Sequence, residues 1–493
     1  MMDWLLAEPA DDCLEDLEAL RRHLELISDP SIPVIDRCGC LDLADGRLLD
    51  ITGRFKPHLL GAAFPLPREV QKAAGDIVDA LLDVAERFLG LISAGVWKHL
   101  RIAEHPQRAL AARGMRMVFD AFQILCMSGA GVPHSFWRLT YLLLAECGRP
   151  ASIVDVIGGT AAGEEGVVLF KALVAVHTLQ PESFTGRELA WIFEYVLPHA
   201  ADVEISGSRM NPESAMTWFE ISREDSPVAQ VRREAPAGAD VLFLRALGLA
   251  RCAGEQIGRL EERIAQAESE GRSCDGELLE SELPLGLSPV EVLSLLRRMR
   301  DRWTIPPSRE HPRRRQIYAV QVCHGLRPMW ELRHGAGKTP RITRWRVFSE
   351  SPGGYAIISV SGETGSLVAG MAIGLRRDPD QPWSVCIVRW IRNERPDEVE
   401  LGLQVVATSY EAVSVGFRDC GAEGTTPALL LPPLPSMRRN PAILAPAGTY
   451  GSRRFMIVRD GEPIYVAQAR VLSLDVQTSS IELFQYEIDP YPG

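Results

Sequence analysis

Two short segments in the C-terminal half of the chain combine residue types that can hold a small anion. Three adjacent arginines, Arg313, Arg314 and Arg315, precede a run with the alternating pattern of a β-strand. Further along, residues 349–354 read Ser-Glu-Ser-Pro-Gly-Gly, which is typical of a tight turn. Guanidinium groups bind phosphate oxygens in pairs, and small turn residues let backbone N–H groups approach a ligand closely. The two segments therefore predict a site for a phosphate-bearing ligand.

The overall charge makes this arginine run informative. The chain of 493 residues carries 53 Lys and Arg against 65 Asp and Glu, a formal net charge of -12 at pH 7. Surfaces for nucleic acid polymers or anionic membranes depend on accumulated positive charge, so this balance argues against both. The apolar runs are far shorter than the roughly 20 residues that span a bilayer, and residues 1–16 lack the basic start of a signal peptide. We expect a cytoplasmic protein without membrane insertion.

The remaining motifs do not indicate catalysis, a metal or a cofactor. Cys38 and Cys40 are the closest pair among ten cysteines, and no further ligand follows them at zinc spacing. The histidines occur singly, outside any known catalytic motif. Residues 335–339 end like a phosphate-binding loop, but Pro340 and a predicted strand follow where a helix must begin. The sequence predicts a protein that is not an enzyme and has no cofactor.

The first 267 residues favour α-helices of a domain type that we do not recognise. Apolar side chains between residues 70 and 92 recur on one face of a 3.6-residue repeat, as in an amphipathic helix. Thr185 and Glu188 have the spacing of a capping box, which marks a helix start. Four further helices are expected, at residues 108–127, 135–147, 166–179 and 185–197.

Two segments near the end of this region differ from the simple helical pattern. Residues 216–231 alternate between apolar and polar side chains, which favours a hairpin inserted among the helices. Residues 240–267 indicate one long amphipathic helix with many Glu, Arg and Gln residues at its end. We favour packing of this helix within the chain; pairing with a second copy in a homo-oligomer is the alternative.

A polar linker is expected to divide the chain. Residues 268–287 collect Ser, Gly, Glu and Asp with few large apolar side chains. Ser288 then provides an N-cap, Pro289 a proline in the first turn and Glu291 a capping carboxylate. We therefore expect a connecting helix over residues 288–303.

From residue 304 the apolar period changes to two, and short predicted strands separated by glycine turns are typical of a barrel. We expect an antiparallel barrel over residues 304–410. Residues 411–493 should add a β extension that begins with a proline-rich bridge at residues 427–446. The fold class is therefore α+β and multidomain. The strands are predicted at residues 317–323, 329–333, 341–349, 355–359, 366–375, 383–392, 400–407, 453–459, 463–472 and 480–488.

Four motifs follow one another in this half of the chain: Arg313-Arg314-x-x-x-Tyr318, Ser349-x-Ser351-x-x-Gly354, Val388-Arg389-Trp390 and Glu400-Leu401-Gly402. In this order they resemble the landmarks of the PilZ domain family, the bacterial cyclic di-GMP receptor module. That family has a second arginine where Tyr318 stands, and Asp or Asn where Ser349 stands. The sequence thus resembles a somewhat degenerate PilZ domain, confined to the C-terminal half.

The resemblance implies a six-stranded barrel that binds cyclic di-GMP and a regulator that signals through the helical domain. The implied protein partner belongs to motility, pili, polysaccharide export or secretion machinery. An alternative is a scaffold or adaptor that has stopped binding nucleotide. The residues implied to hold the ligand are Arg313, Arg314, Arg315, Tyr318, Ser349, Ser351 and Gly354.

Overall fold

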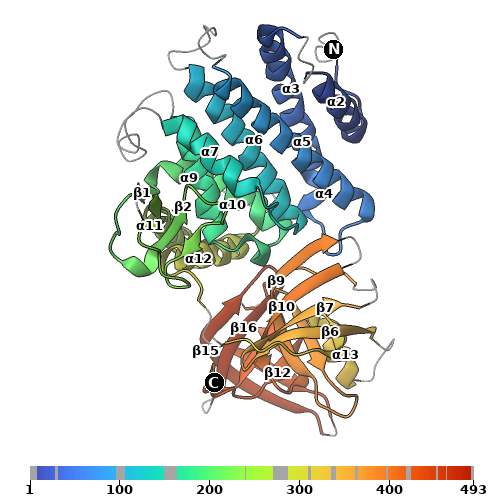
Figure 1. Ribbon diagram of the computed structural model, residues 1–493. Helices are drawn as coiled ribbons and strands as arrows, with labels where there is room; N and C mark the ends of the chain where they lie inside the picture. The colour runs from blue at the N-terminus through green and yellow to red at the C-terminus, as the bar shows by residue number, and fades with distance from the viewer. Residues whose placement is uncertain are drawn as a thin grey trace.

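The computed structural model consists of a helical region followed by two β-barrels, with strands β9 and β10 of the first barrel reaching the helices (Figure 1). This confirms the predicted α+β class. The structure describes residues 8–27, 32–95, 106–148, 164–238, 240–269, 287–308, 312–334, 340–360, 365–395, 398–417, 424–450, 454–461 and 463–489. The loop-like segment at residues 335–339 lies outside this description, as does most of the predicted linker at residues 268–287.

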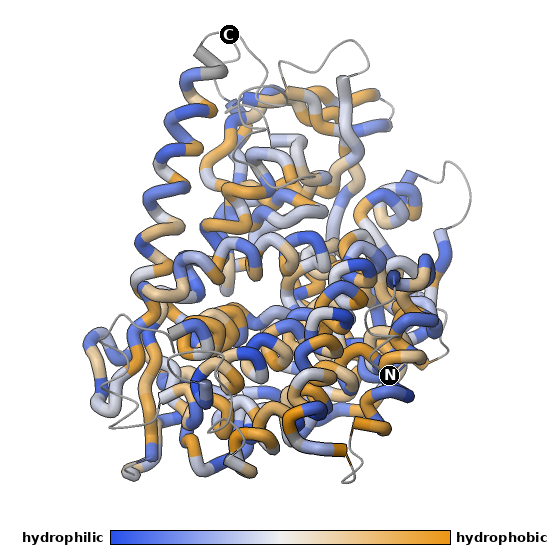
Figure 2. Tube along the Cα trace, turned by 90° about the horizontal axis from the view of Figure 1, so that it is seen from above, coloured by the Kyte–Doolittle hydropathy of each residue, from blue (hydrophilic) through white to orange (hydrophobic). Residues whose placement is uncertain are grey.

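The helical region packs around one central helix, α6 (Pro106–Ser128). This helix contacts α5, α7, α9 and α10, and most of its side chains are buried. Figure 2 shows hydrophobic residues concentrated where these helices lie against one another. The helices predicted from periodicity are present. Their bounds, with those of the shorter helices, are α2 (Cys13–Ile27), α3 (Val34–Phe55), α4 (Pro57–Leu60), α5 (Arg68–Ser93), α7 (Phe136–Gly148), α9 (Glu164–Thr178) and α10 (Gly186–His199).

A small antiparallel sheet interrupts the helices. It joins β1 (Glu204–Ser206), β2 (Met216–Glu220), β3 (Val228–Ala229) and β4 (Val241–Arg245) in the order β1-β4-β2-β3, so the predicted hairpin of β2 and β3 is present. The prediction of one helix over residues 240–267 was wrong at its start. The β-branched and aromatic residues of β4 pair along the whole of β2 instead, and helix α11 begins only at Leu247 (Leu247–Ser269).

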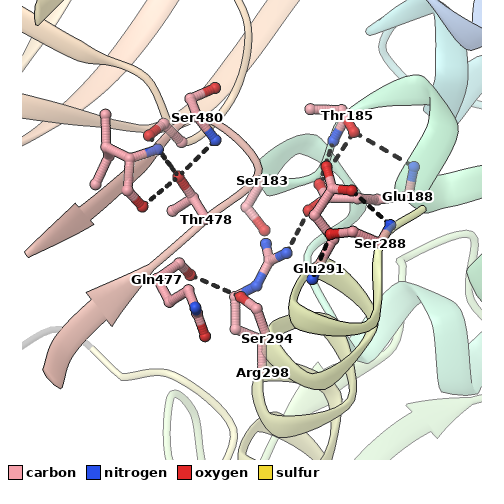
Figure 3. Close-up of polar contacts among 12 residues, drawn as sticks. Ser183, Thr185, Glu188, Ser288, Glu291, Ser294, Arg298, Gln477, Thr478 and Ser480 are labelled. Carbon is pink, nitrogen blue, oxygen red and sulfur yellow. Dashed lines mark hydrogen bonds and ion pairs between the residues drawn. The ribbon is translucent and has the colours of Figure 1, made fainter. Parts of the chain in front are cut away.

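Helix α12 (Pro289–Thr304) follows the linker and contacts both the helical region and the second barrel. Its start is capped by Ser288 and Glu291, as predicted. Trp303 is buried, and its indole N–H donates to the carbonyl of Ala175 in α9 at 3.1 Å. On another face, the Ser294 hydroxyl donates to the carbonyl of Gln477 in the second barrel at 2.9 Å (Figure 3).

The first barrel closes in the order β10-β7-β6-β5-β8-β9. A six-stranded antiparallel barrel was predicted, but the strand expected at residues 329–333 is the helix α13 (Leu326–His334). Gly325, with φ +98°, turns the chain, and Leu326 and Met329 are buried one helical turn apart. The strands are β5 (Tyr318–His324), β6 (Ile342–Ser351), β7 (Gly354–Ser359), β8 (Ala372–Arg376), β9 (Ser384–Arg395) and β10 (Glu398–Ala407).

The C-terminal extension is a second closed barrel, in the order β11-β12-β13-β16-β15-β14. Counted from one to six along the chain, both barrels have the cyclic strand order 1-2-3-6-5-4. The prediction of a bridge at residues 427–446 was wrong, because its prolines lie near strand ends, where they are tolerated. The strands are β11 (Glu411–Phe417), β12 (Thr426–Leu431), β13 (Ala442–Pro446), β14 (Arg454–Arg459), β15 (Tyr465–Gln477) and β16 (Ile481–Ile488).

Helix α13 lies between the two barrels, in contact with β5 and β8 of the first and with β11 and β12 of the second. The Trp330 indole donates to the carbonyl of Val413 in β11 at 2.8 Å, and the Tyr410 hydroxyl donates to the carbonyl of Met329 at 2.6 Å. Buried apolar side chains from α13 and from strands of both barrels form one continuous core. The contact between the two barrels is therefore a buried apolar one.

The helical region meets the first barrel at Asn393 of β9, whose side chain is fully buried. Its amide oxygen accepts from the backbone N–H of Leu66 at 3.1 Å, and its amide nitrogen donates to the carbonyls of Arg395 and Glu398. The Gln71 side chain donates to the backbone carbonyl of Asn393 at 2.7 Å. One strand of the barrel is thus hydrogen-bonded to the start of α5.

Glu188 holds α12 against the helical region (Figure 3). It completes the predicted capping box of α10, in which the backbone N–H of Thr185 donates to its carboxylate at 2.8 Å. The same side chain is 4% exposed and pairs with Arg298 of α12. One buried carboxylate therefore serves both a helix start and a contact between elements.

Glu188→Ala is expected to lower the free energy of unfolding of the helical region by roughly 2 to 4 kcal/mol, because it removes a cap and leaves Arg298 unpaired. Urea denaturation followed by far-ultraviolet circular dichroism measures this loss. Glu291→Ala is the matched control, since it removes the same capping carboxylate from α12 at an exposed site and should cost about 1 kcal/mol. Equal losses in the two variants would contradict the role given to the Arg298 pair.

His324 at the end of β5 is held in its neutral form. Its Nε2 lies 2.5 Å from the Thr343 hydroxyl, which also accepts from the Trp345 indole at 2.9 Å. The other ring nitrogen, Nδ1, is buried with no hydrogen-bond partner in the described part of the chain. Burial and the nearby Arg341 lower the pKa of His324 to about 4 from its ordinary value of 6.5.

Acidification is expected to destabilise the first barrel through His324. Between the two pKa values the unfolded chain binds a proton that the folded barrel does not. The stability that neutral His324 contributes is therefore complete above its unfolded pKa of 6.5 and is lost as the pH falls toward 4. Urea midpoints measured from about pH 7 down to about pH 5 should fall less steeply in His324→Gln than in the natural chain. Identical slopes would show that His324 is not responsible.

Candidate anion-binding site

The arginine segment, residues 313–315, pairs with the end of β6 in the manner of a short additional strand. The backbone N–H of Arg314 donates to the carbonyl of Glu350 at 2.8 Å, and the N–H of Glu350 donates back to the carbonyl of Arg314 at 2.9 Å. The side chains of Arg313, Arg314 and Arg315 are exposed. Two segments far apart in the sequence are thus brought together by backbone hydrogen bonds, with the arginine side chains in solvent.

The predicted turn is the hairpin between β6 and β7. Ser351 pairs with Gly354 across it, and the Ser351 hydroxyl lies 3.4 Å from the Gly354 carbonyl. Ser349 is 9% exposed; a register shift after Val347 pairs it with Ala356, on the face opposite to the interior residues Val347 and Ile357. Of the two serines, Ser351 is the one open to a ligand.

Gly354 is required by the packing of β7 on β10. A Cβ atom at this position would overlap the backbone carbonyl of Leu403, which belongs to the neighbouring strand and cannot move independently. The hairpin is also bonded to β10 by the N–H of Val405, which donates to the carbonyl of Gly353 at 3.0 Å. The glycine of the motif therefore has a structural reason in this chain.

Tyr318, at the position of the second motif arginine, is fixed by two charged residues. Its hydroxyl donates to the Glu350 carboxylate at 2.6 Å, and the Arg377 guanidinium lies 4.7 Å from the centre of its ring. Burial and the Glu350 carboxylate raise the pKa of Tyr318 above its ordinary value, so the phenol stays protonated and keeps donating. The ring is therefore a fixed platform.

We call Arg314, Tyr318, Glu350, Ser351 and Arg377 the barrel-edge cluster. It combines two exposed guanidinium groups, an aromatic ring, a hydroxyl and one carboxylate. Guanidinium groups bind phosphate, and a carboxylate can accept hydrogen bonds from the N–H groups of a guanine. A hollow of about 220 Å³ adjoins the cluster; its lining residues are Ala319, Val320, Gln321, Ile342, Thr343, Arg344 and Arg377.

Sequence reasoning missed Glu350 and Arg377. Glu350 occupies a variable position of the turn motif, and its alignment with Tyr318 follows only from the pairing of β5 with β6. Arg377 follows β8, and only the pairing of β5 with β8 brings it to Tyr318. No spacing rule links residues 318 and 377, so barrel closure was the missing information.

The other two motifs of the resemblance form one packing unit in the wall of the barrel. Trp390 of β9 lies directly opposite Gly402 of β10, and a Cβ atom at Gly402 would overlap the Trp390 indole. A large ring on one strand thus needs a glycine on its neighbour. This pair supports the wall of the barrel and does not contribute to the barrel-edge cluster.

Comparison with known proteins supports the resemblance over much of the chain. Residues 331–411 match the family model described as the middle PilZ domain of the cyclic-di-GMP receptor FimW. This confirms the predicted PilZ resemblance. The match includes the hairpin of Ser351 and Gly354 but not the arginine segment, and it gives no support to calling the barrel degenerate.

The N-terminal half also matches a family model, so restricting the resemblance to the C-terminal half was wrong. Residues 1–212 match the N-terminal domain of the cyclic-di-GMP receptor FimW. The protein of that name from Pseudomonas aeruginosa is 28% identical over 144 residues, which are 28% of this chain and 23% of the relative. The chain thus spans less than a quarter of the length of the curated relative that it matches.

The helices that the structure describes include none with both the length and the apolar character of a membrane span.

Gly354→Ala is expected to destabilise the first barrel by at least about 2 kcal/mol, since the added methyl group meets a backbone carbonyl. Thermal unfolding followed by intrinsic tryptophan fluorescence measures the loss. Gly90→Ala is the control. A Cβ atom there meets no atom within 4 Å, and alanine is the better helix former, so the chain should gain roughly 0.5 to 1 kcal/mol. A neutral Gly354→Ala would contradict the packing role of this glycine.

Proposed function

We propose that the first barrel binds cyclic di-GMP at the barrel-edge cluster and that the protein is a regulator responding to this nucleotide. The observation that carries the proposal is the paired backbone contact between Arg314 and Glu350, which holds exposed arginines beside the hairpin of the turn motif. The names of the matched family models, both parts of a cyclic-di-GMP receptor, support the same ligand.

The ligand chemistry agrees with the residues present. Cyclic di-GMP carries two phosphates and two guanines, so its binding requires separated cations and groups that contact purines. Arginine binds phosphate through paired N–H groups and also stacks on rings. Arg313, Arg314 and Arg315 supply such groups from the segment, and Ser351 offers a hydroxyl from the hairpin. In this proposal Tyr318 forms the platform, while Ser349 and Gly354 shape the hairpin.

Signalling would pass through the junction between the barrel and the helices. Strand β9 belongs to the barrel wall, and its Asn393 is hydrogen-bonded to the start of α5. A ligand that orders the arginine segment against β6 would bias how the barrel sits on the helical region. The protein would then act in the cytoplasm, without catalysis and without a cofactor, on a protein partner of the motility, pilus, polysaccharide export or secretion machinery.

The second candidate function is that of a scaffold whose barrel has stopped binding nucleotide. One observation favours it: Tyr318 replaces a cation, and its hydroxyl is already bonded to Glu350. A carboxylate in the cluster also repels phosphate unless arginines outweigh it. In that case the helical region would hold a partner irrespective of nucleotide.

An enzyme within the helical region is a weaker alternative. The hollow of about 680 Å³ between α10 and α11 is lined by Trp191, Tyr195, His199, Leu260 and charged residues of α11. Nδ1 of His199 lies 2.8 Å from the carbonyl of Tyr195, which ties the ring to its own helix. The lining thus lacks the nucleophile and oriented base of a hydrolase, as far as the described residues go.

Calorimetric titration of cyclic di-GMP into the full chain tests the proposal. We expect saturable binding that Arg314→Ala weakens roughly 10- to 100-fold, the effect of losing one charge-assisted contact. The backbone pairing with Glu350 does not involve the side chain, so the variant should unfold at the same temperature as the natural chain. GTP is the ligand control. Absence of heat up to about a millimolar ligand would reject the receptor and favour the scaffold.

A further inference from the structure

The position where the PilZ pattern has its second arginine holds Tyr318, yet a guanidinium from another strand covers it. The Arg377 side chain lies 4.7 Å from the centre of the Tyr318 ring. We propose that Arg377 supplies the ligand-binding charge that Tyr318 lacks and is a specificity-determining residue of the site. The inference rests on the proposed function, since it names a further residue of the same site.

The barrel fixes where Arg377 lies. Strand β8 pairs with β5 so that Arg376 lies opposite Gln321, and Arg377 follows at the end of the strand. The Arg376 guanidinium donates to the Gln321 side chain at 2.8 Å and to the carbonyl of Pro379 at 2.7 Å, and it covers the Trp383 ring. Arg376 thus anchors the start of the β8–β9 connection, and its neighbour is presented to the outside.

Arg377 keeps its hydrogen-bonding edge available. It is exposed, and it makes no ion pair with any residue that the structure describes. Its guanidinium lies over the Tyr318 ring. A guanidinium over a ring can still offer N–H groups to a ligand, and these groups bind phosphate in pairs.

Two guanidinium groups line the hollow beside the cluster. Arg344 of β6 and Arg377 both line this hollow of about 220 Å³, while Arg314 pairs with Glu350 near the other end of β6. Glu350 is the carboxylate of the cluster, and it accepts the Tyr318 hydroxyl. Arg377 therefore places a guanidinium group between this hollow and the Tyr318–Glu350 pair, in a chain of net charge -12.

The two cations of the proposed site come from opposite sides of one fixed pair. Arg314 is bound to Glu350 through the backbone, while Arg377 covers the ring that donates to Glu350. Tyr318 therefore acts as a positioning residue: it orients Arg377 and brings no charge of its own to the ligand. Arg377 adds to the site what the sequence motif lacks.

The test is calorimetric titration of cyclic di-GMP into the full chain and its variants. Arg377→Ala is expected to weaken binding roughly 10- to 100-fold, and Arg377→Lys to weaken it less, because lysine keeps the charge but loses the planar fork. Arg327→Ala is the matched control. That arginine is exposed on α13 and pairs within its own helix with Glu331, so binding should be unchanged.

A double variant separates compensation from simple loss of structure. Placing arginine at the motif position, Tyr318→Arg, in the Arg377→Ala background should recover binding to within a few-fold of the natural chain. Thermal midpoints of all variants establish that each is folded. Failure of the double variant to recover binding, in a folded chain, would overturn the compensation.

The remaining outcomes distinguish this inference from the proposed function. If Arg377→Ala binds like the natural chain while Arg314→Ala does not, Arg377 has no role and the receptor proposal stands. If the natural chain itself binds no cyclic di-GMP, the receptor proposal fails and this inference fails with it.

Discussion

Closure of the first barrel is the constraint on which the rest of the structure depends. Because β5 pairs with both β6 and β8, residues that are far apart in the sequence meet around Tyr318. Because β9 pairs with β10 and β8, it stays rigid enough to carry the buried Asn393 to the helices. The candidate site and the contact with the helical region are therefore two parts of one closed hydrogen-bonded cylinder.

The second barrel repeats the strand order of the first, but no counterpart of the arginine segment precedes its first strand. In the first barrel the arginine segment enters before β5 and pairs with the end of β6. In the second, β11 begins at Glu411, four positions after β10 ends at Ala407. That connection is too short to lie along β12 in the same way. The same topology thus carries a candidate ligand site in one copy, while the other copy packs against α13 and α12.

The sequence predicted those features that depend on local pattern. The amphipathic repeat of α5, the capping boxes of Thr185 and Ser288 and the alternation of β6 each follow from neighbouring residues. The predictions for features that depend on pairing between distant residues were wrong or missing. Residues 241–245 have an apolar pattern that suits a helix or a strand, and β2 decides between them. Residues 329–333 become a helix because their apolar side chains fill the space between two barrels, the second of which was not predicted.

The same division holds for the candidate site. The arginine run and the hairpin could be found because each is a continuous motif. Arg377 could not, since its relation to Tyr318 exists only across the β5–β8 pair.

The interior of the first barrel is filled by apolar side chains, among them Val320, Trp345 and Ile357, so it is not a container for a ligand. Whatever this domain binds must lie on its outside, where side chains contribute little to the fold. Substitutions at the rim can therefore alter what the domain binds while the cylinder beneath is unchanged. In such a fold the ability to bind and the ability to fold can evolve separately.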